Sequence, residues 1–288
     1  MVAHDTAAWG DSDWVEADLR EHWDALELER DARLVECDGG RVVGYVDVEV
    51  RDGRVIVDGY VHPDRRSEGV GSMLVDWGGE RAAEELERTT GRVYIHYVTI
   101  DRGAAPLLEA HGYEPVRHNW RMLVELSEQP RVVVPDGVEI RQYRAGEEPA
   151  IHAAIGDAWS VGSWQHQPRT YEQWAPLTLE RPGHDRTLCF VALVDGEIVA
   201  AALNDWKRHG DWGWIGILGV RPAFRRRGIA RALLLRSFAE FFRRGERRVA
   251  LHVDADSPTG ATRLYEQAGM RVLYEVDIYE KELRAGTV

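Results

Sequence analysis

The stretch VHPDRRSEGVG at residues 61–71 returns as VRPAFRRRGIA at residues 220–230. In each copy an apolar strand runs into a turn that contains proline, and an Arg-x-x-Gly-x-Gly/Ala segment then begins an amphipathic helix. The start of a helix exposes unpaired backbone N–H groups and the positive end of the helix dipole. Glycine lets an anion approach the backbone closely, and arginine adds a permanently charged, planar donor. The repeated segment therefore predicts a site for a phosphate-bearing ligand.

A short glycine motif on its own is equally consistent with an ordinary strand, turn and helix. The repeat, however, continues on both sides of the loop. Equivalent glycines recur at offsets of 156, 159 and 157 residues, in the pairs Gly40 and Gly196, Gly69 and Gly228, and Gly112 and Gly269. Such a long and nearly constant offset indicates a duplicated domain rather than a solenoid. We therefore expect an N-terminal domain over residues 1–128 and a C-terminal domain over residues 129–288.

Hydrophobic periodicity predicts the same α/β (α+β) architecture in both halves, a mixed and mostly antiparallel sheet flanked by helices. The helix after the first loop is expected to carry Val70, Met73, Leu74 and Trp77 on one face. Residues 1–12 are small and polar and are expected to be mobile, and Asp13 is the expected N-cap of the helix that follows. Strands are expected at residues 42–50, 54–61, 93–98 and 120–126 in the first half, and at 138–141, 189–194, 198–206, 212–220, 249–254 and 273–283 in the second.

The composition narrows the class of protein. The 288 residues include 49 acidic and 36 basic side chains, a net charge of −13, which argues against a general nucleic-acid binder. The sequence shows no Cys/His spacing typical of zinc sites, no recognisable signal peptide and no apolar run long enough to span a bilayer. We therefore expect a cytoplasmic monomer or homodimer with no metal, no nucleic-acid partner and no membrane contact.

The two repeated loops and the segments around them resemble the GNAT superfamily of acyl-CoA-dependent N-acetyltransferases, and the resemblance covers nearly the whole chain twice. In that family the loop cradles the pyrophosphate of coenzyme A, and the thioester lies against the end of the preceding strand. Residues 256–270 also resemble the family's Asn-x-x-Ala-x-x-Leu-Tyr-x-x-x-Gly-Phe segment. The resemblance implies acetyl-CoA as the acyl donor, held by Leu218, Gly219, Val220, Arg225, Arg226, Arg227, Gly228, Ile229 and Ala230 in the second domain, and by Arg66, Gly69 and Gly71 in the first.

The family places a tyrosine beside the sulfur of coenzyme A, and Tyr265 stands at that position. The resemblance implies that Tyr265 is the general acid that protonates the departing thiolate; the alternative is an aromatic side chain packed under the sheet, where Leu264 looks more core-like. Leu108 occupies the equivalent position in the first domain and cannot donate a proton. The first domain also lacks an obvious opening strand before Glu36. We expect it to be a degenerate partner, which either keeps a coenzyme A site or uses its loop only as a turn.

The general base has several candidates on or near the strands where the family's sheet splays open. His252 has a pKa suited to proton transfer near neutral pH, with a core histidine as the alternative, and Asp254 lies on the same strand. Asp254 and Asp256 alternatively cap the next helix, and Asp211 or a water chain are further possibilities. Two or three tryptophans are expected to line an acceptor pocket and the rest to be core, from the set Trp159, Trp164, Trp174, Trp206, Trp212 and Trp214.

The leading function is acetyl-CoA-dependent N-acetyl transfer to a small-molecule amine, with the chemistry in the second domain. The tandem layout resembles mycothiol synthase-like proteins, although residues 212–217 lack the carboxylate that those enzymes carry on this strand. One alternative is therefore acetylation of a cysteinyl aminoglycoside-type thiol precursor. The others are a non-catalytic acyl-CoA-binding sensor or scaffold, and a protein N-terminal acetyltransferase. Tyr265 favours an enzyme, whereas the lack of an evident base favours a sensor.

Overall fold

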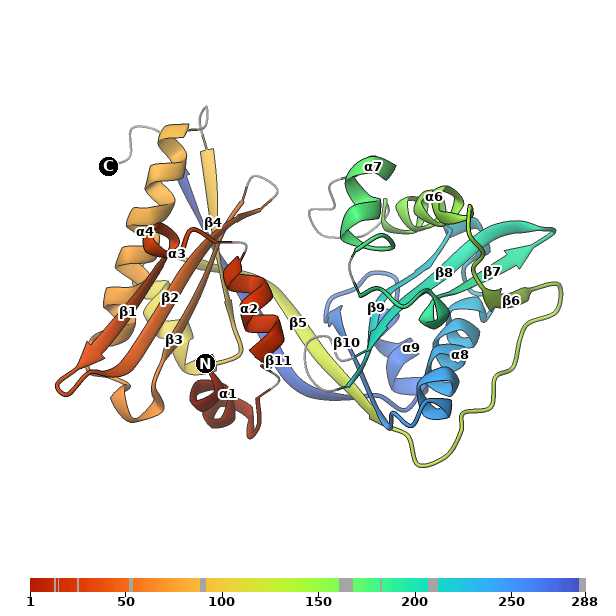
Figure 1. The fold of residues 1–288 in the computed structure, drawn as a ribbon, viewed down its shortest axis with the longest axis horizontal. Coiled ribbons are helices and arrows are strands. Elements are labelled where there is room, and N and C mark those ends of the chain that lie inside the picture. The colour runs from red at the N-terminus through yellow and green to blue at the C-terminus, as the bar shows by residue number, and fades with distance from the viewer. Residues whose placement is uncertain are drawn as a thin grey trace. The chain divides into compact units, whose positions relative to one another are not determined.

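The computed structural model describes residues 1–12, 14, 16–24, 26–51, 54–88, 92–160, 168–181, 183–206 and 212–284. Contacts divide the chain into two compact units, with Met1–Asn119 and Tyr274–Val288 in unit 1 and Trp120–Leu273 in unit 2. Each unit has a mixed sheet flanked by helices, which confirms the α/β fold expected from the sequence (Figure 1). No helix within these described residues is both long and apolar enough to cross a membrane.

Unit 1 is a sheet covered by helices on both faces. Its elements are α1 (Val2–Trp9), α2 (Glu16–Asp24), α3 (Leu28–Asp31), β1 (Ala32–Cys37), β2 (Arg41–Arg51), β3 (Arg54–Val61), α4 (Val70–Arg88), β4 (Arg92–Thr99), α5 (Ala105–Ala110), and parts of β5 (Glu114–Glu125) and β11 (Arg271–Arg284). The strand order is β1-β2-β3-β4-β11-β5. β3 and β4 run parallel, whereas the β1–β2, β2–β3 and β4–β11 pairs are antiparallel. α4 covers one face and packs Val70, Leu74 and Val75 into the core, while α2 lies over the other face (Figure 1).

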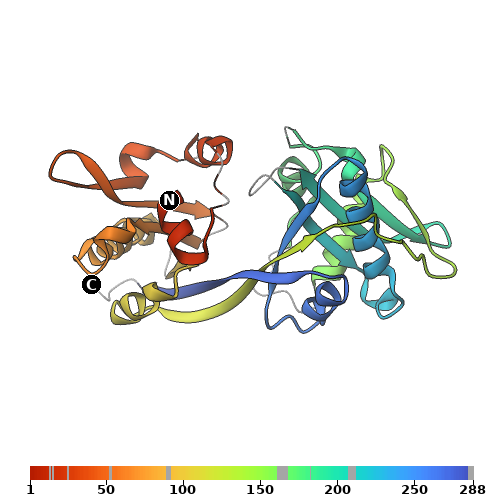
Figure 2. The same cartoon turned by 90° about the horizontal axis from the view of Figure 1, so that it is seen from below.

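Unit 2 repeats this plan. Its further elements are β6 (Glu139–Gln142), α6 (Glu148–Trp159), α7 (Tyr171–Trp174), β7 (Phe190–Val194), β8 (Glu197–Trp206), β9 (Gly213–Val220), α8 (Ile229–Arg243), β10 (Arg248–Asp254) and α9 (Ala261–Gln267). The strand order is β5-β10-β9-β8-β7-β6, with β9 and β10 parallel. α6 and α8 lie on opposite faces of this sheet (Figure 2). Alternate residues of β8 point to opposite faces, so Leu203 packs on the α6 side and Ala202 on the α8 side.

The unit boundaries differ from the predicted division at residues 128 and 129. β11 runs antiparallel to β4, with Asp277 opposite Thr99, so Tyr274–Val288 groups with unit 1. β5 also carries residues of both units, because the division falls between Asn119 and Trp120. The last strand of the chain thus completes the first sheet, which a linear reading of the repeat does not anticipate.

Three expectations about unit 1 are corrected. Residues 1–12 are not a mobile segment, because α1 lies there and buries His4 and Asp5 to 8% and 3% exposure. An opening strand exists, since β1 pairs antiparallel with β2. Met73 is 59% exposed and does not belong to the buried face of α4. The expected N-cap Asp13 lies outside the described residues.

An ion pair at the start of unit 2 predicts a pH-dependent stability. Arg141 donates to both carboxylate oxygens of Glu147, at 2.9 and 2.6 Å, which lowers the pKa of Glu147 from 4.5 to about 2. A folded-state pKa below the unfolded value stabilises the fold above about pH 5, and this contribution is lost as the pH falls toward 2. Because both side chains keep contact with solvent, we expect Glu147→Gln to lower the free energy of unfolding at pH 7 by about 1 kcal/mol.

Urea titrations across pH 7 to 3 check this expectation. The difference between wild type and Glu147→Gln should shrink steadily below pH 5. A difference that stays constant down to pH 3 would contradict it.

Candidate functional site

The two repeated loops have the same backbone conformation. Each passes through a short 3-10 turn, Pro63–Arg65 in unit 1 and Pro222–Phe224 in unit 2, before its long helix begins. Two residues of each loop have positive φ, namely Ser67 at 63° and Gly69 at 86°, and Arg226 at 63° and Gly228 at 79°. The first-turn N–H groups of α4 and α8 have no intrahelical acceptor and lie beside these turns. The sequence repeat is therefore a repeat of backbone geometry suited to an anion.

In unit 2 this loop follows β9, which pairs with its parallel neighbour β10 only near the start of β9 among the described residues. Within the described residues, β9 pairs with β10 at two positions only, Gly213 and Trp214. Gly216 then forms a bulge against β8, because Ile215 and Ile217 face consecutive residues of that strand. A bulge bends its strand and increases the local twist. Beyond the bulge, β9 has no ladder pair with β10 among the described residues, and the strand ends at the predicted thioester residues Leu218, Gly219 and Val220.

α6 closes one side of this strand end. A Cβ at Gly219 would lie 3.1 Å from the Cβ of Ala158 and 3.8 Å from the indole Nε1 of Trp159. Gly219 therefore allows α6 to pack closely on β9, and Trp159 lies next to the strand end. Val220 is 9% exposed, and Leu218 packs against the core. These contacts give the three strand residues a packing role in addition to the predicted one.

The arginines of the second loop divide into two kinds. Arg225 donates to the carbonyl oxygens of Val220 at 3.2 Å and Ala158 at 2.6 Å, so it ties the loop to β9 and α6. Arg226 and Arg227 are exposed. Ile229 is 1% exposed and anchors the first turn of α8, while Ala230 is half-buried. The loop therefore presents two arginines and the backbone around Gly228 to solvent.

The loop of unit 1 differs in charge. Arg66 forms an ion pair with Asp101 at 2.7 Å, and Arg65 forms one with Glu68 at 3.2 Å. Glu68 occupies the position that corresponds to Arg227 in unit 2. Both arginines of this loop thus already have carboxylate partners. Close packing favours glycine at residue 71, because a Cβ at Gly71 would lie 2.8 Å from the side chain of Leu107.

The strand opening of unit 1 is filled by its own N-terminal helix. β3 and β4 pair as far as Val57 and Tyr97, and beyond these residues β3 ends at Val61 and β4 at Thr99. His4 of α1 packs edge-on against Tyr60 at 5.3 Å and lies 3.7 Å from the Asp101 carboxylate. β2 and β3 remain in continuous register, without the bulge seen in unit 2. The two units therefore share the loop but not the space beside it.

Tyr265 lies on α9 in unit 2 and is 8% exposed. It belongs to the core cluster that includes Phe238 and Leu251, and burial raises the pKa of its phenol to about 12. The phenol is therefore protonated at neutral pH, as a general acid requires. Leu264 is only half-buried, so the expectation that Leu264 is the more core-like of the two is wrong. Leu108 occupies the matching place on α5 and is 2% exposed.

Two of the predicted base candidates, His252 and Asp254, lie on β10. His252 is exposed rather than a core histidine, with its ring edge-on to Trp214 at 5.3 Å. Its Nε2 accepts a hydrogen bond from the guanidinium of Arg121 at 3.3 Å. Asp254 accepts from the backbone N–H of Asp256 at 3.0 Å and so shapes the turn before α9. Asp211, the remaining candidate, lies outside the described residues.

Arg121 was not identified from the sequence. It is 1% exposed on β5, and its guanidinium lies over the rings of Trp214 at 4.4 Å and Trp212 at 5.6 Å. The available signal was one arginine within the otherwise apolar stretch of residues 120–124. Ile215, Val249 and Leu251 face α8, so by alternation Trp214 and His252 face the opposite side of the sheet.

The tryptophans of the second half fall into different environments. Trp174, Trp212 and Trp214 are buried, Trp159 is half-buried and Trp206 is 36% exposed. Trp164 lies outside the described residues. Trp159 and Trp214 are the two that lie next to predicted site residues, the first beside Gly219 and the second beside His252.

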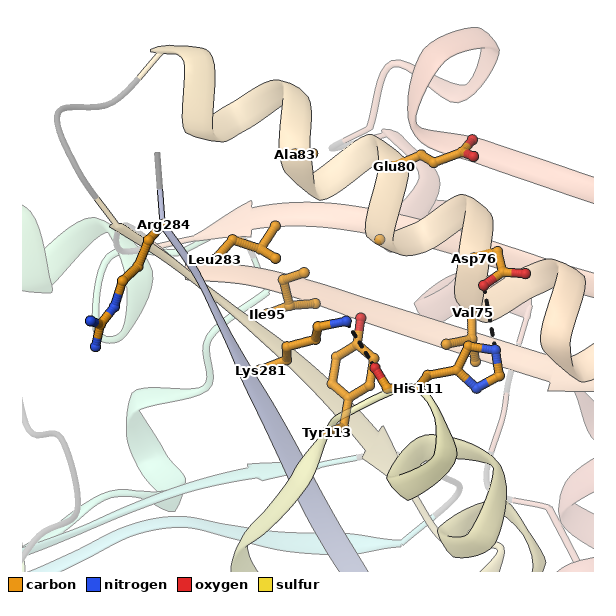
Figure 3. Close-up of a pocket in the computed structure, with 11 residues that line it drawn as sticks. Val75, Asp76, Glu80, Ala83, Ile95, His111, Tyr113, Lys281, Leu283 and Arg284 are labelled. Carbon is orange, nitrogen blue, oxygen red and sulfur yellow. Dashed lines mark hydrogen bonds and ion pairs between the residues drawn. The ribbon is translucent and has the colours of Figure 1, made fainter. Parts of the chain in front are cut away.

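A separate pocket of 280 Å³ lies in unit 1, away from the predicted site residues (Figure 3). α4, β4 and β11 line it, and Tyr113 and Lys281 point into it. The Lys281 ammonium donates to the carbonyl oxygen of His111 at 2.8 Å. None of the loop residues of unit 1 lines this pocket.

Comparison with family models matches each unit separately. Residues 149–270 match the acetyltransferase (GNAT) family, and residues 30–115 match an acetyltransferase (GNAT) domain. A mycothiol acetyltransferase from Thermomonospora curvata is 31% identical over 263 residues, which cover 88% of this chain and 83% of that protein. Another from Saccharopolyspora erythraea is 28% identical over 246 residues, covering 81% and 80%.

Solved structures agree with this match. A GCN5-related N-acetyltransferase from Sphaerobacter thermophilus is 34% identical, with a TM-score of 0.88 over 99% of this chain and 91% of that chain. A tandem GNAT protein from the clavulanic acid biosynthesis pathway has a TM-score of 0.68 over 100% and 93%, and at 16% identity it supports the fold alone.

Proposed function

The chain belongs to the acetyltransferase (GNAT) family, and from this premise we propose that unit 2 transfers the acetyl group of acetyl-CoA to the amine of a small molecule. The observation that carries the proposal is the loop of unit 2. Its backbone, with positive φ at Arg226 and Gly228, places exposed arginines and the start of α8 next to the part of β9 that has no described ladder pair with β10. An anion-binding turn beside a free backbone edge suits a long ligand with phosphates at one end.

We assign the pyrophosphate of acetyl-CoA to Arg226, Arg227, Gly228 and the first N–H groups of α8, Ile229 and Ala230. Arg225 holds this loop in shape through its bonds to Val220 and Ala158. The acyl thioester is assigned to the edge formed by Leu218, Gly219 and Val220. A strand edge offers backbone N–H and C=O groups to an extended ligand, as in strand addition.

Acetyl transfer to an amine needs a base and an acid. The ammonium loses a proton, the amine attacks the thioester carbonyl, and the C–S bond breaks to release a thiolate that takes up a proton. We assign the acid to Tyr265, whose raised pKa keeps its phenol protonated. His252 is assigned as base through an intervening water, a role that requires its Nε2 to exchange the hydrogen bond from Arg121 for that water, and Asp254 is the second candidate. No step requires a metal.

Unit 1 is proposed to be catalytically silent. Leu108 stands where Tyr265 stands, both loop arginines have carboxylate partners, and His4 occupies the strand opening. Whether this loop still binds coenzyme A through Arg66, Gly69 and Gly71 depends on displacing Asp101 and His4. We assign the protein to the cytoplasm, as a monomer or homodimer, without nucleic acid or membrane as a partner.

A more specific acceptor is favoured by the relatives. The mycothiol acetyltransferase that is 31% identical covers 88% of this chain, so a cysteinyl aminoglycoside-type thiol precursor is the second candidate substrate. Residues 212–217 contain no carboxylate, whereas mycothiol synthase-like enzymes carry one on this strand. This difference counts against an acceptor bound in the same way as in those enzymes. Trp159, which is half-buried beside Gly219, offers a flat surface that suits a sugar-like amine.

Release of free thiol from acetyl-CoA with a panel of acceptors tests the proposal. The panel contains amino sugars, a cysteinyl amino sugar, amino acids and peptides with free N-termini. We expect release well above background hydrolysis with at least one small amine. Release with peptides alone would support an N-terminal acetyltransferase, and calorimetric binding of acetyl-CoA without turnover of any acceptor would support a sensor. Acetylated product, identified by mass, separates transfer from hydrolysis.

A further inference from the structure

Three metal-ligating side chains meet on the sheet of unit 1, on the face opposite α4. Asp47 on β2 and Asp58 on β3 are directly paired across the two strands, and His22 on α2 lies over them. Val46, Val48 and Val57 pack in the core beneath α4, so by alternation both aspartates point to the other side. The Nε2 of His22 and a carboxylate oxygen from each aspartate all lie within 4.8 Å of one another.

Asp47 is the most buried of the three side chains, and one of its carboxylate oxygens has no hydrogen-bond partner among the described residues. Its side chain is 1% exposed, and one oxygen, Oδ2, lies 3.1 Å from His22 Nε2. The other oxygen, Oδ1, is buried and has no hydrogen-bond partner among the described residues. A buried carboxylate oxygen without a partner is costly, because its hydration is lost and nothing replaces it.

The surrounding charge is also negative. Two carboxylates directly opposite on neighbouring strands repel each other. A cation bound between the two carboxylates offsets this repulsion.

We propose that His22, Asp47 and Asp58 bind one divalent transition-metal ion, such as Zn²⁺ or Mn²⁺. Imidazole nitrogen and carboxylate oxygen together are a donor set that such ions accept. Ligand atoms around a tetrahedral ion with bonds of about 2.1 Å lie about 3.4 Å apart, so the half-buried His22 and Asp58 must close by roughly 1 Å. The ion offsets the negative charge of the two aspartates and is coordinated by the buried oxygen of Asp47 that has no hydrogen-bond partner. Through His22 it also holds α2 against the sheet.

This site is independent of acetyl transfer. Its ligands come from α2, β2 and β3 and are separated by 25 residues between His22 and Asp47, so no spacing motif marks it in the sequence. The expectation of no metal in this chain rested on such motifs, and the present proposal departs from it.

Metal binding to the full chain tests the proposal. Protein stripped with a chelator is titrated calorimetrically with Zn²⁺ and with Mn²⁺, and with Co²⁺ while the visible spectrum is recorded. We expect one ion per chain, a Co²⁺ spectrum typical of nitrogen and oxygen ligands, and a rise in the midpoint of thermal unfolding. His22→Gln and Asp58→Asn should each weaken binding by about 100-fold and abolish that rise.

A matched control and a second readout guard against misfolded variants. Asp64 lies 3.7 Å from His62 as another His and Asp pair of unit 1, is exposed, and Asp64→Asn should leave the affinity unchanged. Circular dichroism without metal verifies that His22→Gln and Asp58→Asn are folded. The proposal is overturned if wild type shows no saturable binding below about 1 mM ion, or if neither His22→Gln nor Asp58→Asn weakens it.

Discussion

Gly228→Val should abolish acetyl transfer, whereas Gly69→Val should leave most of it. Both glycines open a long helix with φ near +80°, at 79° and 86°, so valine introduces similar backbone strain at the two positions. A Cβ at Gly69 would meet no described atom within 4 Å, and at Gly228 it would meet only Pro135 at 3.4 Å. The fold should therefore tolerate either change to a similar degree. What differs is the ligand, because only the second loop is proposed to hold the pyrophosphate.

The expected magnitude is large. Valine at residue 228 places two methyl groups where the anion must approach the first N–H groups of α8, and loss of several charge-assisted hydrogen bonds should weaken acetyl-CoA binding by at least about 100-fold. Calorimetry with acetyl-CoA and turnover with a working acceptor measure the effect, and circular dichroism verifies folding. Transfer that survives Gly228→Val but fails in Gly69→Val would move the active site to unit 1.

Tyr265→Phe should lower turnover by roughly ten- to a thousand-fold, with acetyl-CoA affinity nearly unchanged. Phenylalanine keeps the ring that packs against Phe238 and Leu251 and removes only the proton donor. The donor is active while protonated, that is, below its pKa of about 12, so ionisation of Tyr265 should not reduce turnover between pH 7 and pH 10.

Tyr113 provides the matched control for this substitution. It is a buried tyrosine next to α5 in unit 1, 3% exposed, and its pKa is also raised to about 12 by burial. Tyr113→Phe removes a comparable phenol outside the proposed site and should leave turnover unchanged. Equal turnover for wild type and Tyr265→Phe would remove Tyr265 from the mechanism and leave it as a core aromatic side chain.

Part of the candidate site could be predicted from the sequence. The predictable part depends on neighbouring residues, and the rest depends on contacts between residues far apart in the chain. The loop at residues 225–230 could be predicted because positive φ, a helix start and an arginine are properties of neighbouring residues. The role of Arg225 could not, since its acceptor, the carbonyl of Ala158, lies 67 residues away in the chain. The family resemblance predicted that Arg225 binds coenzyme A. In the structure its guanidinium donates to the carbonyl oxygens of Val220 and Ala158, so Arg225 holds the loop in position.

The same distinction applies to His252. Alternating hydrophobicity placed it correctly on a strand, but its side chain is exposed and accepts a hydrogen bond from Arg121, 131 residues away in the chain. A pattern of alternating burial describes which face a residue occupies and not what lies on that face. Arg121 was therefore absent from the predicted site, although it is among the most buried charged side chains described.

By itself the sequence determined the duplication, the α/β fold of each half, most strand and helix positions and the repeated loop before each long helix. These follow from periodicity and turn chemistry, which act over a few residues. Only the tertiary structure decided that β11 completes the first sheet, that α1 fills the opening beside the first loop, and that His22 meets Asp47 and Asp58. Those arrangements depend on pairing and packing between segments far apart in the chain, and the free energy that selects them appears only once the sheet has formed.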